Sequence, residues 1–165
     1  MEKIRKLTFD DEDVINELVK KSLENKDELS VGNLLPTDRN VESFFRLEIF
    51  PILFEDDPIL GYFEEDKLLG FSCCSTKANK LYDLKESSAI GGITICDPEF
   101  RRRGIGSKLR LSIAKELKSR NIKKFIFEIK CDNKASLSNA QKISKELNAD
   151  AELISFRFGG KVDVF

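Results

Sequence analysis

Hydrophobic and polar residues recur along the first part of the chain with the periods of a strand and then of a helix. Residues 3–8 alternate and predict a first strand. We expect Asp10 to cap the helix that follows, with Phe9 and Val14 packing as a hydrophobic staple. The apolar face of this helix consists of Val14, Ile15, Leu18, Val19 and Leu23.

The middle of the chain predicts a second helix and a hairpin. Residues 30–40 contain glycine, asparagine and proline and predict a loop. Residues 41–50 form an aromatic-rich helix, which Pro51 should end or kink because proline has no amide proton. Residues 59–63 and 68–75 then predict two strands joined by a polar turn.

The second half predicts strands and helices in alternation. Residues 89–96 form a strand that Pro98 stops, and residues 105–120 form an amphipathic helix. Residues 124–131 form a strand whose apolar core suits burial on both faces. A closing hairpin occupies residues 151–165. The helix before it is marked by Leu137, Ala140, Ile143 and Leu147.

The resulting order is β-α-α-β-β-β-α-β-α-β-β. It predicts an α/β (α+β) fold with a single mixed, mostly antiparallel sheet and flanking helices. The strand–helix–strand unit at 89–131 should be a right-handed crossover between parallel strands. Because we find no repeat, linker or low-complexity stretch, we expect residues 1–165 to form a single domain.

Composition narrows the possible partners. The 165 residues include 28 basic and 29 acidic ones, a net charge of −1, which disfavours nucleic-acid or anionic-membrane binding. The first residues reach no apolar stretch like that of a signal peptide, and no apolar run approaches the ~18 residues of a membrane span. We therefore expect a cytoplasmic protein without nucleic-acid or membrane partners, as a monomer or homodimer.

The residues available for chemistry exclude several mechanisms. The sequence has no histidine, which excludes Ser-His-Asp and Cys-His nucleophile systems and His-bearing zinc sites. The four cysteines form no C-x-x-C pair, so we predict no metal. Cys73, Cys74, Cys96 and Cys131 are instead expected to be small apolar thiols, buried in a reducing cytosol.

The most informative stretch joins the strand at 89–96 to the helix at 105–120. It reads Arg101-Arg102-Arg103-Gly104-Ile105-Gly106. A helix N-terminus presents unpaired N–H groups, glycines let the backbone approach a phosphate, and arginines donate charge-assisted hydrogen bonds. The stretch therefore predicts a phosphate or pyrophosphate site. Without the glycines and the helix, three arginines would indicate only a solvated charge cluster.

Two common nucleotide fingerprints do not fit this loop. The segment 104–108 is too short for G-x-x-x-x-G-K-[ST]. Leu109 stands where G-x-G-x-x-G requires its third glycine. A nucleotide-binding protein of another class stays open at this point.

The pattern Arg101-x-x-Gly104-x-Gly106 resembles the [RQ]-x-x-G-x-[GA] signature of the GNAT superfamily of acyl-CoA-dependent N-acetyltransferases. The order of elements is similar over nearly the whole chain. The resemblance implies a GNAT-like fold, acetyl-CoA as the acyl donor, and direct transfer of an acetyl (acyl) group to an amine of unknown identity.

The resemblance also assigns residues to the cofactor. The pantetheine arm would pair with the strand end at Thr94, Ile95 and Cys96, and Asn133 matches an asparagine that contacts the pantetheine region. Residues 127–131 should splay from 93–96 and leave a slot for the thioester. The loop around the pyrophosphate would comprise Arg101, Arg102, Arg103, Gly104, Ile105, Gly106 and Ser107.

The catalytic assignments are less complete. Glu128 matches a glutamate of peptide-amine acetyltransferases and is a candidate general base, unless it is an ordinary solvated strand residue. Ala140 occupies the position of the family's tyrosine, which protonates the leaving thiolate. This departure favours the alternative of a non-catalytic acyl-CoA-binding or sensing module. Residues 27–40 would shape the acceptor groove.

Overall fold

A computed structural model describes residues 2–24, 41–77, 87–127, 129, 133–148, 154–157 and 161–164. The chain divides into two compact units, residues 1–128 and residues 129–165. The first unit contains the sheet and the glycine loop, and the second contains the last helix and the closing hairpin. Each unit is described by itself.

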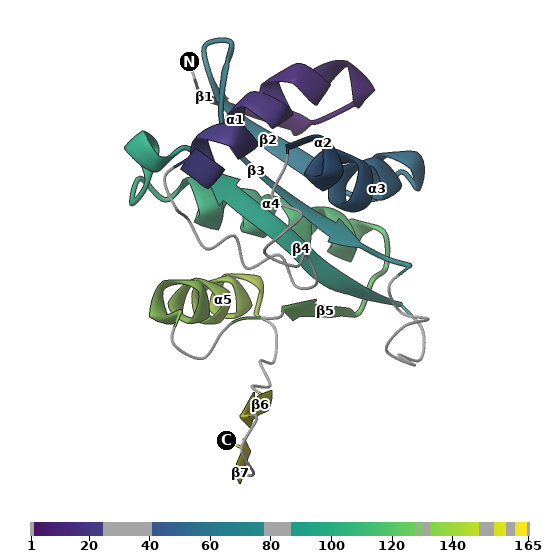
Figure 1. The fold of residues 1–165 in the computed structure, drawn as a ribbon. Helices are drawn as coiled ribbons and strands as arrows, with labels where there is room; N and C mark the ends of the chain where they lie inside the picture. The colour runs from purple at the N-terminus through teal and green to yellow at the C-terminus, as the bar shows by residue number, and fades with distance from the viewer. Residues whose placement is uncertain are drawn as a thin grey trace. The chain divides into compact units, whose positions relative to one another are not determined.

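The first unit is built on a five-stranded sheet (Figure 1). Its strands are β1 (Glu2–Lys6), β2 (Ile59–Glu64), β3 (Lys67–Ser75), β4 (Ser88–Cys96) and β5 (Lys124–Phe127), in this order across the sheet. All neighbours are antiparallel except β4 and β5, which are parallel. The predicted α/β class with a mixed, mostly antiparallel sheet is confirmed.

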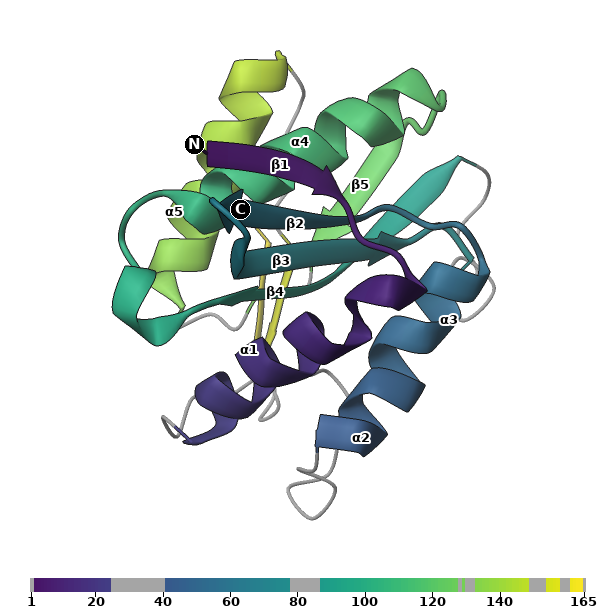
Figure 2. The ribbon, with the colours of Figure 1, turned by 90° about the horizontal axis from the view of Figure 1, so that it is seen from above.

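Helices cover both faces of this sheet (Figures 1 and 2). One face carries α1 (Glu12–Glu24), α2 (Val41–Phe44) and α3 (Phe50–Phe54), and the other carries α4 (Ile105–Ser119). On the first face Ile15, Leu18 and Val19 pack against the buried ring of Phe71. On the second, Leu109, Ile113 and Leu117 pack against Leu69. The predicted apolar stripes are therefore the buried faces.

The start of α1 differs from the prediction. The cap is Thr8, not Asp10, and it precedes a short 3₁₀ helix, η1 (Phe9–Asp11). The expected staple is also wrong, because Phe9 lies inside the helical segment, is 47% exposed and contacts the Phe50 ring at 5.5 Å. Leu7, directly before the cap, is fully buried and brings the chain into the helix two residues earlier.

The aromatic helix continues past the predicted proline break. Its α-helical start at Val41–Phe44 passes into a π-helical turn, η2 (Phe45–Ile49), closed by the Phe50 N–H donating to the Phe45 carbonyl. Pro51 lies in the first turn of α3, where a missing N–H costs no helix hydrogen bond. The helical segment therefore passes through Pro51 without ending, and its α-helical hydrogen bonding is interrupted before the proline, at the π-helical turn.

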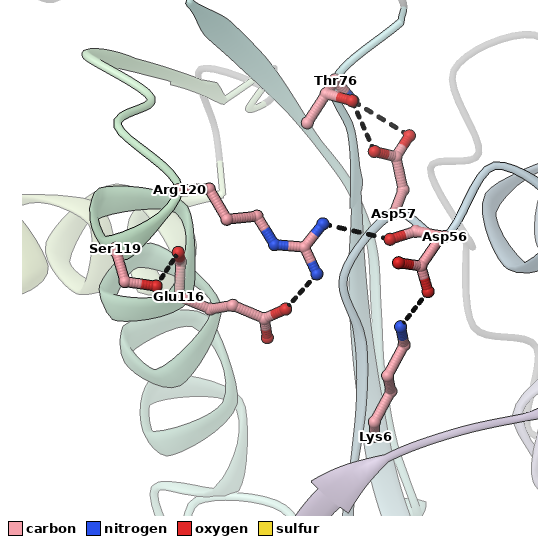
Figure 3. Close-up of polar contacts among 7 residues, drawn as sticks. All are labelled: Lys6, Asp56, Asp57, Thr76, Glu116, Ser119 and Arg120. Carbon is pink, nitrogen blue, oxygen red and sulfur yellow. Dashed lines mark hydrogen bonds and ion pairs between the residues drawn. The ribbon is translucent and has the colours of Figure 1, made fainter.

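The end of α4 far from the glycine loop is held by polar contacts (Figure 3). The Arg120 guanidinium donates to the Asp56 carbonyl at 3.1 Å and pairs with Glu116 at 2.5 Å. Asp56 also pairs with Lys6, beside the end of β1. These contacts join the C-terminal end of α4 to the turn before β2 and, through Asp56, to the end of β1.

The second unit contains α5 (Lys134–Leu147) and the strands β6 (Ile154–Arg157) and β7 (Lys161–Val164). The two strands pair antiparallel, which confirms the closing hairpin, but they form a two-stranded sheet of their own where a single sheet was predicted. The predicted hairpin turn and the predicted end of the strand at 124–131 fall mostly outside the described residues.

Candidate active site

The pairing between β4 and β5 covers only part of β4, and we call the place where it ends the split. The two strands pair only from Ser88 to Gly91 on β4, opposite Lys124 to Phe127 on β5. On its other edge β4 stays paired with β3 as far as Cys96. Within the described part of the chain no strand pairs with the β5-side edge of residues 92–96. The sequence predicted a slot along this edge, and most of residues 127–131, which should splay from it, fall outside the described residues.

A β-bulge marks the point of the split. Thr94 pairs with Ser72, and Gly91 pairs with Cys74. Between these two pairs β4 therefore has one residue more than β3. Such a bulge bends the strand and disrupts the ladder locally. A Cβ at Gly92 would lie 2.8 Å from the Cys73 sulfur, so the bulge requires glycine there.

The open edge of β4 offers backbone groups at alternate residues. The Asp97 N–H donates to the Leu69 carbonyl at 2.8 Å, so the backbone of Asp97 faces β3. Alternation along an antiparallel strand then directs the N–H and C=O of Thr94 and Cys96 to the open edge. The Ile95 side chain is only 2% exposed and belongs to the core under α1.

Asp97 fixes the end of β4 before the loop. Its carboxylate is buried, 1% exposed, and accepts the Glu99 N–H at 3.1 Å, which caps a short 3₁₀ helix, η4 (Pro98–Phe100). The ammonium groups of Lys21 and Lys67 lie 3.3 and 3.6 Å from the same carboxylate. Contacts from α1 and β3 thus hold the strand-to-loop junction.

The loop adopts the backbone that its glycine predicts. Gly104 caps α4 with a φ of 79°, in the left-handed region that glycine enters without strain. Gly104 has no side chain that could cap this helix, and no acidic residue lies in the first turn. The first described backbone bond of α4 runs from the Lys108 N–H to the Gly104 carbonyl. The amides before Lys108 have no carbonyl acceptor within the helix, as at any helix start.

The three arginines are exposed but are not equivalent. Arg103 donates to both carboxylate oxygens of Glu64, at 2.5 and 3.3 Å, and lies 5.3 Å from the centre of the Phe100 ring. Arg103 therefore ties the loop to the end of β2. Arg102 takes a φ of 63°, so the backbone turns sharply beside the helix start.

One face of α4 lies directly over the open part of β4. A Cβ at Gly106 would sit 3.5 Å from the Thr94 methyl group and 3.7 Å from the Cys96 sulfur. One turn later, the Arg110 Nε donates to the Thr94 hydroxyl at 3.0 Å, and that hydroxyl also bonds Ser72 at 2.8 Å. We did not predict Arg110. Its spacing of four from Gly106, next to the apolar stripe, is the signal that could have found it.

Burial controls the titration of the groups around the site. Burial raises the pKa of the Cys96 thiol, although Arg101 and Arg110 oppose the shift. Burial lowers the pKa of the Arg110 guanidinium. It also raises the pKa of Cys73 to about 12. These two thiols are protonated near neutral pH, as expected for packing residues and unlike an activated nucleophile.

The described residues include only some of the remaining candidates. Glu128 and Cys131 fall outside the described residues, as does the loop at 30–40. Asn133 belongs to the second unit, where its side chain caps α5 by accepting the Ser136 N–H at 3.0 Å. Tyr62 is buried on β2 and its hydroxyl lies 3.5 Å from the Lys108 ammonium.

The described segments of the chain hold neither a metal site nor a membrane span. They contain no group of three or more Cys, Asp or Glu side chains arranged to hold a metal ion. No helix in them combines the length and apolar character needed to cross a membrane.

Comparisons with known proteins agree with this geometry. A family model described as the acetyltransferase (GNAT) family matches residues 27–143. None of the curated proteins matches the sequence significantly.

Solved structures with the same fold are numerous, and three illustrate their range. PaiA N-acetyltransferase from Thermoplasma acidophilum, in complex with coenzyme A, has a TM-score of 0.64 and 19% identity, covering 98% of this chain and 96% of that one. A ribosomal-protein-alanine N-acetyltransferase from Brucella melitensis has a TM-score of 0.66 at 17% identity, with coverages of 98% and 95%. The aminoglycoside acetyltransferase meta-AAC0020 from an uncultured soil sample, bound to sisomicin, scores 0.62 at 17% identity, with 97% of each chain covered.

Proposed function

The chain belongs to the acetyltransferase (GNAT) family and is an N-acetyltransferase that uses acetyl-CoA, and on this premise we propose that the donor occupies the split between β4 and β5. The observation that carries the proposal is the end of β4–β5 pairing at Gly91, while β4 continues to Cys96. An extended pantetheine arm has amide groups that can pair with the open edge, as an added strand would.

The proposed pantetheine contacts are the backbone groups of Thr94 and Cys96. In this arrangement Ile95 contributes through its position in the strand, since its side chain packs into the core. Asn133 stays a prediction from the family resemblance, through whichever of its polar atoms is not engaged in capping α5.

The proposed pyrophosphate site is the start of α4. Ile105, Gly106 and Ser107 would contribute amides, and the partial positive charge of the helix end favours an anion. Gly104 supports the turn, and Arg101 and Arg102 add cationic donors. Arg103 would hold the loop through Glu64 or exchange that carboxylate for a phosphate oxygen.

The proposed reaction is direct transfer of the acetyl group to an amine. The amine nitrogen attacks the thioester carbonyl carbon, the carbon–sulfur bond breaks, and CoA leaves as a thiolate. A backbone N–H near residues 94–96 would polarise the thioester carbonyl. Glu128, directly or through water, would accept the proton that the amine loses.

The acceptor is proposed only as a class. Structures with this fold include enzymes named for ribosomal-protein alanine and for aminoglycosides. Both kinds of acceptor carry an amine, but one is a residue of a protein and the other is an aminoglycoside. A panel for this chain should therefore contain peptides with a free N-terminus, lysine peptides, polyamines and aminoglycosides.

Calorimetry with acetyl-CoA, followed by CoA release with the amine panel, tests the proposal. We expect the double substitution Arg101→Ala/Arg102→Ala to weaken acetyl-CoA binding at least about tenfold, because each arginine contributes charge-assisted hydrogen bonds. Lys115→Ala/Lys118→Ala removes two exposed charges from the same helix and should leave binding unchanged. Equal loss in both double variants, or no binding by the unmodified protein, would overturn the proposed site.

Two further outcomes concern catalysis. Binding of acetyl-CoA without CoA release across the whole panel would favour the non-catalytic binding module. If Glu128→Gln leaves kcat/KM unchanged across pH, Glu128 is not the base.

A further inference from the structure

Arg110 spans the split in the sheet. Its Nε donates to the Thr94 hydroxyl of β4 at 3.0 Å, and its guanidinium carbon lies 5.5 Å from the centre of the Phe127 ring of β5. Thr94 lies on the open part of β4, whereas Phe127 is the last residue of β5. The guanidinium therefore contacts both strands near the end of their pairing.

The orientation of Arg110 is fixed on both sides. The Thr94 hydroxyl that accepts from Nε is itself hydrogen-bonded to Ser72 at 2.8 Å. The planar guanidinium lies near an aromatic ring, an arrangement that favours a cation. The N–H donors of a guanidinium held in this way are preorganised, because the side chain loses little further freedom when they bind another acceptor.

The charge of Arg110 has no acidic partner among the described residues. Arg5, Arg103 and Arg120, by contrast, each pair with a carboxylate. Arg110 is partly buried, and burial lowers its pKa, so its positive charge is costly in the absence of an anion. The ionisable group that faces it from β4 is Cys96, while β3 and β5 present Ser72 and Phe127.

The proposed reaction creates an anion in this slot. When the carbon–sulfur bond breaks, its electron pair stays on sulfur, and the family's usual tyrosine is replaced by Ala140. We propose that Arg110 stabilises the CoA thiolate as it leaves, through charge and N–H donation without proton transfer. This inference rests on the proposed function, because it requires CoA to lie in the split. The thiolate would take its proton from water after release.

The first test compares CoA with desulfo-CoA, which lacks the thiol. Arg110 should favour the thiolate form, so the affinity ratio of CoA to desulfo-CoA should rise with pH as the thiol titrates near ~8.5. An opposite charge within reach shifts a pKa by at least about one unit, which corresponds to about tenfold in this ratio. Arg110→Met should abolish that rise. Cys96→Ser should keep it, which excludes titration of Cys96 as the cause.

The second test is kinetic. Arg110→Met should lower kcat about 100-fold, in line with the loss of one preorganised electrostatic donor. The KM for acetyl-CoA should change less than about threefold, since the neutral thioester gains little from the charge. Arg110→Lys keeps the charge and should recover part of kcat. Lys115→Met, a matched change at an exposed position of the same helix, should behave like the unmodified enzyme.

The outcomes separate this inference from the proposed function. If Arg110→Met binds CoA with the unmodified pH dependence, or keeps its kcat, the inference is overturned while the donor site stands. If the unmodified protein binds neither CoA nor desulfo-CoA, the proposed function fails first. Should Arg110→Met not fold, Arg110→Gln, which can keep the Thr94 hydrogen bond, carries the same two tests.

Discussion

The helical segments that begin at Thr8 and at Gly104 lie in the same unit and start in opposite ways. At Thr8 the chain supplies its own anion, because the Asp11 carboxylate accepts the Thr8 N–H at 2.9 Å and pairs with Arg5 at 2.6 Å. Further acids, Glu12 and Asp13, follow in the next turn. At Gly104 there is no capping side chain and no acid, and arginines precede the helix instead.

The two helix starts differ in whether the protein itself supplies the anion. Asp11 lies at the third position of its segment and is 8% exposed, so the positive end of that helix is already neutralised. Ser107 holds the same position in α4. A helix start without a capping side chain or an acidic residue is less stable by itself but can bind an anion from outside.

The largest effect is expected when α4 is made to resemble the segment at Thr8. Ser107→Asp places a carboxylate at the position equivalent to Asp11. We expect acetyl-CoA affinity to fall at least about 100-fold, because like charges brought together at a binding site cost several kcal/mol. Calorimetry measures the loss.

Ser107→Asn is the matched neutral control and should bind within about threefold of the unmodified protein, since it adds a side chain without charge. The Asp variant should also be slightly more stable to denaturant, by about 0.5 kcal/mol. If it binds acetyl-CoA as well as the Asn variant does, the start of α4 does not hold the pyrophosphate.

The reverse change removes the anion at Thr8. Asp11→Asn should lower the free energy of unfolding by about 2 kcal/mol at neutral pH, because Arg5 and the Thr8 N–H lose a charged acceptor. Urea denaturation measures it. Asp13→Asn, an exposed acid in the next turn, should cost under about 0.5 kcal/mol.

The cost of Asp11→Asn should depend on pH. The hydrogen bond with Arg5 chiefly lowers the pKa of Asp11 in the folded protein below its ordinary value of 3.8. The stabilisation is therefore fully present above that ordinary value and is lost as pH falls through the lower, folded pKa. A difference between the two proteins that stayed constant down to pH 2 would contradict this assignment.

A smaller effect separates the two glycines of the loop. Gly104→Ala should destabilise the protein by about 1 kcal/mol, because an L-residue is strained at its φ of 79° even though no atom lies within 4 Å of the added Cβ. Gly106→Ala meets only ordinary contacts, the nearest at 3.5 Å, and should be neutral or stabilising. Denaturant midpoints compare the pair. If both substitutions destabilise the protein equally, the space around the added Cβ, and not the backbone conformation, requires these glycines.

The smallest effect concerns the loop's own ion pair. Glu64→Gln releases Arg103 from a partly exposed carboxylate, and such pairs contribute about 0 to 1 kcal/mol. We expect acetyl-CoA affinity to rise up to about fivefold as Arg103 becomes available to phosphate. Lower affinity in this variant would mean that Arg103 serves only to hold the loop.

Much of this site could be predicted because its chemistry is local. Gly104, Pro98 and the amphipathic stripe at 105–120 act within a few residues of themselves, so the strand, the turn and the helix start follow from the order of residues. The misplaced cap at Asp10 is instructive, because acids occupy every position from 10 to 13. The burial of Leu7 and the ion pair between Asp11 and Arg5 determine that the helical segment begins at Thr8.

The sequence by itself determined the types and order of the elements and the anion-binding character of the loop, because periodicity, capping and backbone preference are short-range. Tertiary structure decided the end of β4–β5 pairing at Gly91, the Arg103–Glu64 pair across 39 residues, and Arg110 over Thr94. These contacts depend on strand register and on the placement of α4 over the sheet. Residues far apart in the chain set both, so no short pattern encodes them.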